Sequence, residues 1–279
     1  FNKDITDDAA TAIAINAPRD EALQNLGMQQ VRDGKSINHA VNFMRSAMAA
    51  GFKGKEGSGD LFGFDDLGRD IFPRLLTGAQ VSLLVVALVT TLTASVGIML
   101  GLISGYYGGW IDRTLMQITD VFLAFPGILL AIAFAAVLGA GLSNLILALC
   151  VTSWVGYARL TRSQVLSLRQ RQHVMAAESL GASTLRIMLK HMLPLLAAPL
   201  LVEATYSMAG LVIAEASLSF LGLGIQAPDA SWGGMLRDGV RYMVIAPHYV
   251  LAVGLSLMSL VLAVNVLGDR LRDYLDVRG

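Results

Sequence analysis

The chain has 279 residues, of which 54% are hydrophobic and only 15% are charged, and its formal net charge is zero. Soluble domains carry about 25% charged residues, so this composition is typical of a membrane protein. The zero net charge gives no indication of nucleic-acid binding, and the single cysteine, Cys150, excludes a disulfide within the chain.

The first part of the chain, residues 1–62, is polar and charge-balanced. It holds no apolar run of the about 20 residues that a membrane-spanning helix needs. Helix start and stop signals predict two short helices, residues 18–32 and 37–50, followed by a glycine-rich linker over 51–59. We interpret this segment as an extracytoplasmic helical hairpin with its linker, and docking of a partner is the less favoured alternative.

Five apolar stretches follow, and in lipid each must be helical because every backbone polar group needs a partner within the chain. They are Val81–Ile103, Val121–Leu138, Leu142–Val155, Leu193–Ala216 and Tyr249–Leu267. Pro126 lies near the start of the second stretch and removes one backbone hydrogen bond, so we expect a kink there. The chain is therefore predicted to be an all-α, polytopic membrane protein, with residues 63–279 forming a domain surrounded by membrane lipid.

A polar segment, Arg159–Pro194, separates the third and fourth stretches and carries six lysines and arginines against one acid. Such an excess of basic residues marks a cytoplasmic loop, which we place at residues 158–192. Residues 1–75 then lie outside, and the tail from Gly268 lies in the cytoplasm. An external N-terminus with no span before it predicts one further transmembrane helix preceding Phe1.

Small side chains gather at the centre of this loop, around Glu178. They are Ala176, Ala177, Gly181 and Ala182. A short helix with small residues on one side can sit in a groove of another protein, with the two backbones close together. The segment is too polar to span the membrane, so we favour a docking site for a partner over a solvated loop.

Two acidic residues lie within the fourth stretch, and such groups are costly in lipid and usually face protein or water. At about 1.5 Å of rise per residue, Glu203 lies about 14 Å and Glu215 about 31 Å from Pro194 along the helix. Glu203 is the deeper acid, for which lining a transport path and hydrogen bonding to a neighbouring helix are equally favoured. Glu215 is a second path candidate, placed near the external face. Arg159, at the inner end of the third stretch, is interpreted as an anchor at the membrane interface.

Three glycines, Gly97, Gly101 and Gly105, repeat at four-residue spacing in the first stretch. A stripe of small residues lets another helix approach closely in lipid. We favour packing within the chain over an interface with another subunit.

Catalytic and nucleotide-binding signatures are missing from the sequence. It has no GxxxxGK[ST] loop for ATP phosphates, no HExxH zinc motif and no GxSxG nucleophile motif. The four histidines, His39, His173, His191 and His248, are not at metal-ligand spacing. We therefore expect a transport protein rather than an enzyme, with no metal or cofactor held by this chain.

Several sequence blocks follow one another in the order found in a known family of transport proteins. They are residues 63–70 (GFDDLGRD), 104–110 (SGYYGGW), 124–127 (AFPG), 216–224 (ASLSFLGLG), 226–228 with 231–233 (QAP and SWG), and 267–273 (LGDRLRD). From Gly63 onward the chain resembles the second permease subunit of the dipeptide, oligopeptide and nickel family of ABC importers. Residues 176–181, with Pro194 closing the segment, resemble the EAA coupling loop of these permeases.

The chain departs from the family pattern at four positions. Phe64, Met175, Arg270 and Val277 stand where the family has threonine, glutamate, glycine and proline. Because that glutamate belongs to the coupling loop, the replacement at Met175 implies one salt bridge fewer to an ATPase.

The resemblance implies a type I-like ABC importer permease bundle of six helices, the first of which precedes this sequence. It also implies a homologous second permease, two ABC ATPases that carry ATP and magnesium, and an extracytoplasmic substrate-binding protein. The ATPases would grip the coupling residues, which are Met175, Ala176, Ala177, Glu178, Gly181, Ala182 and Leu185. The binding protein would face the loop Ser217–Tyr242, including Gln226 and Trp232.

The function implied by this resemblance is ATP-driven uptake across the inner membrane by alternating access, with di- and oligopeptides as the favoured substrates. Glutathione and nickel complexes are alternatives within the family, and nickel is disfavoured because Glu203 is the one suitable ligand in the expected path. An ion-coupled transporter is a rival from another class. It would need charged residues deep in several helices, and these are few here.

Overall fold

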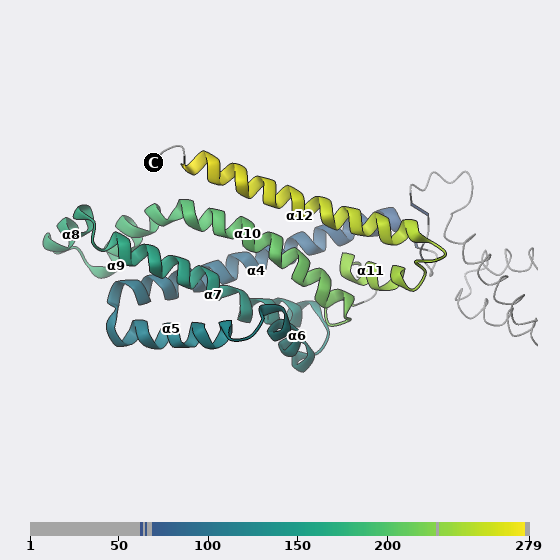
Figure 1. Cartoon of the computed structure of the whole chain (residues 1–279), viewed down its shortest axis with the longest axis horizontal. Helices are drawn as coiled ribbons and strands as arrows, with labels where there is room; N and C mark the ends of the chain where they lie inside the picture. The colour runs from purple at the N-terminus through teal and green to yellow at the C-terminus, as the bar shows by residue number, and fades with distance from the viewer. Residues whose placement is uncertain (1–61, 64, 66–68, 227–228, 277–279) are drawn as a thin grey trace, which may run out of the picture.

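The computed structural model describes residues 62–63, 65, 69–226 and 229–276, and no strand occurs among them. In chain order the elements are α4 (Ile71–Tyr107), α5 (Gly109–Leu123), α6 (Gly127–Leu138), α7 (Leu142–Leu168), α8 (Gln172–Ser179), α9 (Thr184–Arg186), the π-helix η1 (Ile187–Met192), α10 (Leu193–Phe220), α11 (Trp232–Val240) and α12 (Pro247–Asp276). The long helices run roughly along one direction (Figure 1). The helices expected at residues 18–32 and 37–50, and the linker at 51–59, fall outside the described residues.

The long membrane-spanning helices contain the predicted apolar stretches and extend beyond them at both ends. By length and composition, three helices can cross a membrane: α4, the continuous helix from Thr184 through η1 and α10 to Phe220, and α12. The bent pair of α5 and α6 makes a fourth span if it counts as one. α7 is long enough but less apolar, because its second half carries Arg159, Arg162 and several hydroxyl side chains. We assign it as the remaining span because it packs along α4.

α4 and α7 pack against each other through the three glycines of α4. A Cβ atom at Gly97 would lie 2.5 Å from the Trp154 carbonyl oxygen, and one at Gly101 would lie 2.6 Å from the next turn of the α7 backbone. At Gly105 the nearest atom would belong to Val165, at 2.8 Å. Because both sets of residues advance together, the two helices run parallel. The glycine stripe therefore serves packing within the chain, and that prediction is confirmed.

The second predicted stretch, Val121–Leu138, is not one helix. α5 begins earlier, at Gly109, and ends at Leu123, and its axis differs from that of α6 by 85°. The break falls just before α6, at Pro126, which lacks an N–H donor and whose ring disfavours helical geometry in the residue before it. The expected kink is thus a complete break between two helices.

The basic segment is mostly helical rather than a loop. α7 continues to Leu168, and the helix that leads into α10 begins at Thr184, so only α8 and its flanking turns separate them. The turns at Ile187–Met192 are π-helical. A wider turn fits there because Pro194 has no N–H to donate to the carbonyl four residues earlier. The apolar pattern misses these extensions because it reports only the part of a helix that lies in lipid.

The beginning of α4 is fixed by residues of the GFDDLGRD block. Asp70 is the N-cap and accepts a hydrogen bond from the backbone N–H of Phe72 at 3.0 Å. Asp65 is buried, and its carboxylate accepts hydrogen bonds from the backbone N–H of Arg69 at 2.8 Å and from its Nε at 2.7 Å. The block therefore closes this end of the first described helix.

Candidate coupling segment and membrane path

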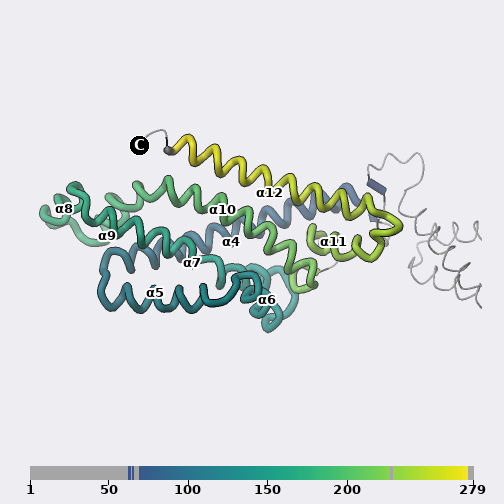
Figure 2. Tube along the Cα trace, viewed as in Figure 1, coloured from purple at the N-terminus to yellow at the C-terminus, as the bar shows by residue number. Residues whose placement is uncertain are grey.

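α8 and the turn after it project beyond the bundle, at the end opposite to the start of α4 (Figure 1). The C-terminal end of α12 lies on the same side (Figure 2). Val174 is buried, and Ala177 and Ala182 pack with it against residues of α7 and η1. One apolar side therefore fixes the projecting segment to the bundle.

The rest of this segment is exposed, and much of its surface is apolar. Met175, Leu180 and Leu185 are exposed, and the side chain of Leu180 is 88% exposed. Gly181 makes the turn after α8 with a φ of 77°, which other residues rarely adopt. Leu180 is not one of the predicted coupling residues, of which Met175, Ala176, Glu178, Gly181 and Leu185 are exposed. Exposed apolar groups gathered on a small projection are typical of a surface that binds a partner protein.

An ion pair ties together three helix ends close to this segment. Arg162 of α7 donates to both carboxylate oxygens of Asp112 in α5, with 2.7 Å between Nη2 and Oδ2. Ser104, near the end of α4, donates to Asp112 Oδ1 at 2.5 Å. Beside them the guanidinium of Arg169 lies 5.6 Å from the centre of the Tyr106 ring. These contacts join α4, α5 and α7 where α7 leads into α8.

Replacing Arg162 with alanine is expected to lower the free energy of unfolding by about 1–3 kcal/mol, because it leaves the half-buried carboxylate of Asp112 without its charged partner. Arg162→Lys keeps the charge but loses the two-pronged contact, so its loss is smaller. Thermal unfolding of the detergent-solubilised chain measures both. Arg171→Ala, at an exposed arginine before α8, is the control. Equal melting temperatures for the two alanine variants would contradict this role for Arg162.

Glu215 does not lie at an external surface. Its side chain is fully buried, and its carboxylate accepts hydrogen bonds from Ser82 of α4 and Ser219 of α10, both at 2.9 Å. The predicted place of Glu215 in a transport path is therefore corrected: it joins α10 to α4. The correction depends on Ser82, which is 133 residues away in sequence and gives no local signal.

Glu215→Ala is expected to destabilise the bundle by about 1–3 kcal/mol, because two buried serine hydroxyls lose their acceptor and a cavity forms. Glu215→Gln keeps the volume and one acceptor oxygen, so most of the stability remains. Melting temperatures in detergent measure the difference. A glutamine variant that melts as low as the alanine variant would show that the negative charge, rather than the hydrogen bonds, matters.

Glu203 lies half-buried on α10, against α7. A Cβ atom at Gly156 of α7 would lie 2.9 Å from Glu203 Oε1. One helical turn further along α7, Arg159 Nη2 lies 3.4 Å from Oδ1 of Asp120 in α5, and both of these side chains are more than half exposed. Ionic groups therefore lie on two flanks of α7: Glu203 of α10 on one flank, and the pair of Arg159 and Asp120 on the flank toward α5.

Of the two residues after α10 that were predicted to face a binding protein, one is exposed and the other is buried. Gln226 is exposed, and its side-chain amide donates to the carbonyl oxygens of Gly222 and Gly224 at 2.9 and 3.2 Å. Trp232 is only 4% exposed, and its indole N–H donates to the Leu75 carbonyl of α4 at 2.9 Å. The prediction that Trp232 faces a binding protein is therefore corrected, because this side chain anchors α11 to α4.

Residues 97–278 match the family model for the inner membrane component of binding-protein-dependent transport systems. The match covers more than half of the chain. The chain belongs to this permease family. It is therefore a multi-pass transport subunit of the ABC importers and not an enzyme.

Two relatives of the permease are named for the transport systems to which they belong. The glutathione transport system permease protein GsiD of Escherichia coli O157:H7 is 49% identical over 215 residues, which are 77% of this chain and 71% of that protein. The dipeptide transport system permease protein DppC of Alkalihalophilus pseudofirmus is 46% identical over 215 residues, with the same shares.

The fold of the permease is similar to that of a chain from the MetNI methionine ABC transporter in an inward-facing conformation. The TM-score is 0.60 at 22% identity, over 73% of this chain and 97% of that one. At this identity the likeness shows the fold, which is the type I importer permease bundle that the sequence predicts.

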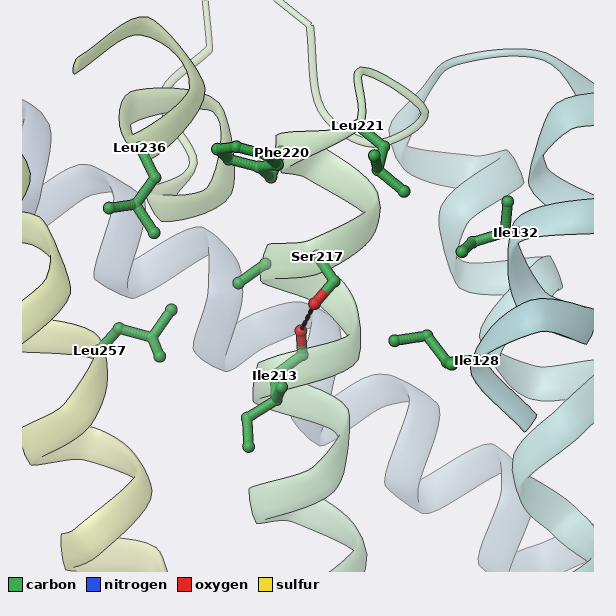
Figure 3. A pocket seen from close by; sticks show the side chains of 9 residues that line it. Ile128, Ile132, Ile213, Ser217, Phe220, Leu221, Leu236 and Leu257 are labelled. Carbon is green, nitrogen blue, oxygen red and sulfur yellow. Dashed lines mark hydrogen bonds between the residues drawn. The ribbon is translucent and has the colours of Figure 1, made fainter. Parts of the chain in front are cut away.

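An apolar pocket of about 360 Å³ opens between α6, α10 and α12 of the permease (Figure 3). Ile128 and Ile132 of α6 line one side, and Leu257 of α12 lines the other. Ser217 also lines it, but its hydroxyl donates to the Ile213 carbonyl at 2.7 Å. The pocket therefore suits an apolar group rather than a charged substrate.

Two features of the permease were not named from the sequence, the exposed Leu180 and the ion pair of Asp112 and Arg162. Leu180 had a local signal, since it is a large apolar residue beside Gly181 within a polar segment. The pair of Asp112 and Arg162 had none, because 50 residues separate them and only the packing of α5 against α7 brings them together.

Proposed function

We propose that this permease takes up short peptides as part of an ATP-driven complex. The complex would contain a homologous second permease, two ABC ATPases and an extracytoplasmic substrate-binding protein. ATP and magnesium would bind to the ATPases, because this sequence has no phosphate-binding loop. Support for a peptide substrate comes from the relatives named for dipeptide and glutathione transport.

The observation that carries this proposal is the shape of the coupling segment. The segment of α8, the turn after it and α9 projects beyond the bundle, is fixed to it by Val174, and leaves the apolar side chains of Met175, Leu180 and Leu185 exposed. Exposure of these apolar side chains to water is unfavourable, and binding in a groove of an ATPase would bury them.

The orientation follows from the basic residues of this end. We place α8 and the C-terminal end of α12 in the cytoplasm, because Arg169, Arg171 and Arg186 lie around α8. The start of α4 and the loop with Gln226 are then external, and residues 1–62 form an extracytoplasmic segment.

Motion of the ATPases would reach the path through helices that are continuous with the segment. α7 enters it directly, and the helix from Thr184 runs into α10 without interruption. The Asp112–Arg162 pair adds α5 to this unit. Closing of the ATPases on ATP would therefore tilt α5, α7 and α10 and shift the bundle between its outward and inward states.

Glutathione is the second candidate substrate, favoured by the GsiD relative at 49% identity. It shares the charged ammonium and carboxylate groups of a peptide but contains a side-chain amide linkage. Competition between a dipeptide and glutathione in the same uptake assay separates the two substrates.

Purification of the tagged chain from its native membrane, followed by mass spectrometry and reconstitution into liposomes, tests this function. We expect two ATPases and a second permease to co-purify. Uptake of a labelled dipeptide should require both ATP and the binding protein. Recovery of the chain alone, together with uptake driven by an ion gradient without ATPases, would favour an ion-coupled transporter.

A further inference from the structure

Two helices of the permease present outward faces that suit lipid. On α12 the exposed side chains repeat at helical spacing and are apolar; they are Leu251, Leu255, Met258, Leu262 and Val266. On α4 the outward side chains Leu84, Leu88, Leu92 and Met99 form a similar face. These faces show what lipid-exposed surface looks like in this molecule.

The inner half of α7 presents a different outward face. Ala158, Thr161 and Val165 are buried on the side toward α4, where the α4 glycines lie. The residues exposed on the opposite side repeat at helical spacing and are small or polar; they are Gly156, Arg159, Ser163 and Ser167. We call these four residues the α7 stripe.

Charged side chains of the neighbouring helices flank the α7 stripe. α7 lies between α5 and α10, with α4 behind it (Figure 1). Asp120 of α5 reaches Arg159 at 3.4 Å, and the two side chains are 61% and 54% exposed. Glu203 of α10 lies against Gly156 on the other side. The stripe therefore carries one cation with an acid on each side.

The flanked part of the stripe lies at the depth of the membrane. Ala158 packs beside Gly97 and Gly101 of α4, so the neighbouring Arg159 lies at the level of these glycines. Gly97 and Gly101 are about 9 and 3 Å along α4 from Ile103, where the apolar stretch ends, so Arg159 lies within the apolar stretch rather than beyond it. An ionisable group within a membrane-spanning segment is costly in lipid and usually faces protein or water.

We propose that the α7 stripe, with Asp120 and Glu203, lines a water-filled inner vestibule through which substrate leaves the permease. In it, Arg159 pairs with the carboxylate of a zwitterionic substrate, and the flanking carboxylates pair with its ammonium group. The loose contact between Arg159 and Asp120 allows this exchange, because each side chain is more than half exposed. The inference rests on the proposed function and names residues and a substrate class for it.

Labelling of a single cysteine in the assembled, liposome-reconstituted complex tests the water-filled vestibule. In a Cys150→Ala background, Ser163→Cys and Ser259→Cys place the same side chain at two exposed serines, one in the α7 stripe and one on the lipid face of α12. A charged, water-soluble methanethiosulfonate reagent is the probe. We expect it to modify Ser163→Cys more than about ten-fold faster, since the reactive thiolate hardly forms in lipid.

Equal, slow labelling of the two variants would overturn the vestibule. So would labelling of Ser163→Cys only after the partner subunits are removed, because the stripe would then be a subunit interface. Labelling needs no transport, so its failure beside intact ATP-driven uptake would refute the vestibule and leave the proposed function standing.

The role of Arg159 in binding has its own test in the same liposomes. Uptake of dialanine by Arg159→Gln should fall about ten-fold or more, and Arg159→Lys should recover most of it because the charge returns. Both variants should assemble with the ATPases at wild-type yield. Wild-type uptake by Arg159→Gln would overturn the pairing with substrate, and so would a lysine variant that recovers nothing.

Discussion

Gly101→Leu is expected to prevent the bundle from folding. A Cβ atom there would lie 2.5 Å from Cβ of Thr161 and 2.6 Å from the Ala158 carbonyl oxygen of α7. Overpacking in a core costs about 1–3 kcal/mol when side chains can move aside. The cost is larger here because backbone atoms obstruct the new side chain, and α4 and α7 must separate along their length. The yield of monodisperse protein in detergent measures the effect.

Gly210→Leu in α10 is the matched control for this change. A Cβ atom at Gly210 would have no neighbour within 4 Å, so the same substitution should leave yield and melting temperature near those of the wild type. Comparable yields for the two leucine variants would show that the glycine contact between α4 and α7 does not hold the bundle together.

Leu180→Asp is expected to abolish ATP-driven uptake without unfolding the chain. The side chain of Leu180 is 88% exposed on the coupling segment, so a charge there costs the isolated permease almost nothing. Burying an unpaired carboxylate in an interface commonly costs about 2 kcal/mol or more, because the charge loses its water and gains no partner. A buried aspartate would therefore weaken ATPase binding by more than about 30-fold. Co-purification of the ATPases and uptake by reconstituted liposomes are the two readouts.

Val244→Asp provides the control for Leu180→Asp. Val244 is 81% exposed in the turn between α11 and α12, at the opposite end of the bundle, so its change should leave ATPase recovery intact. Full recovery of the ATPases with Leu180→Asp would place their docking site elsewhere on the permease.

The sequence predicts the membrane helices well where they lie in lipid and poorly where they leave it. The stretch Val81–Ile103 lies within α4, and Tyr249–Leu267 lies within α12. By contrast, the second half of α7 and α5 up to Asp120 have mixed polarity. α7 faces α4 on one side and polar groups on the other, so average hydropathy cannot recognise it as a continuous helix. The break at Pro126 was visible as a kink, but its size depends on how α6 packs.

The residues of the candidate site also fall into those that the sequence placed correctly and those that it misplaced. The exposed coupling residues lie on the projection that the basic segment predicts, and Glu203 lies at a partly open surface of α10. Trp232 and Glu215 were misplaced because the partners that bury them, Leu75 and Ser82, belong to α4, far away in the chain.

By itself, the sequence determined the class of the protein. Its apolar stretches, their order and the basic segment between them follow from composition and local spacing, because apolar stretches of this length span lipid as helices and basic residues are in excess in cytoplasmic loops. Tertiary structure decided which polar groups are internal and which are open. Glu215 and Arg159 look alike as charged residues near spans. Packing against α4 buries the first, and the position of Arg159 on α7 opposite α4 leaves it exposed.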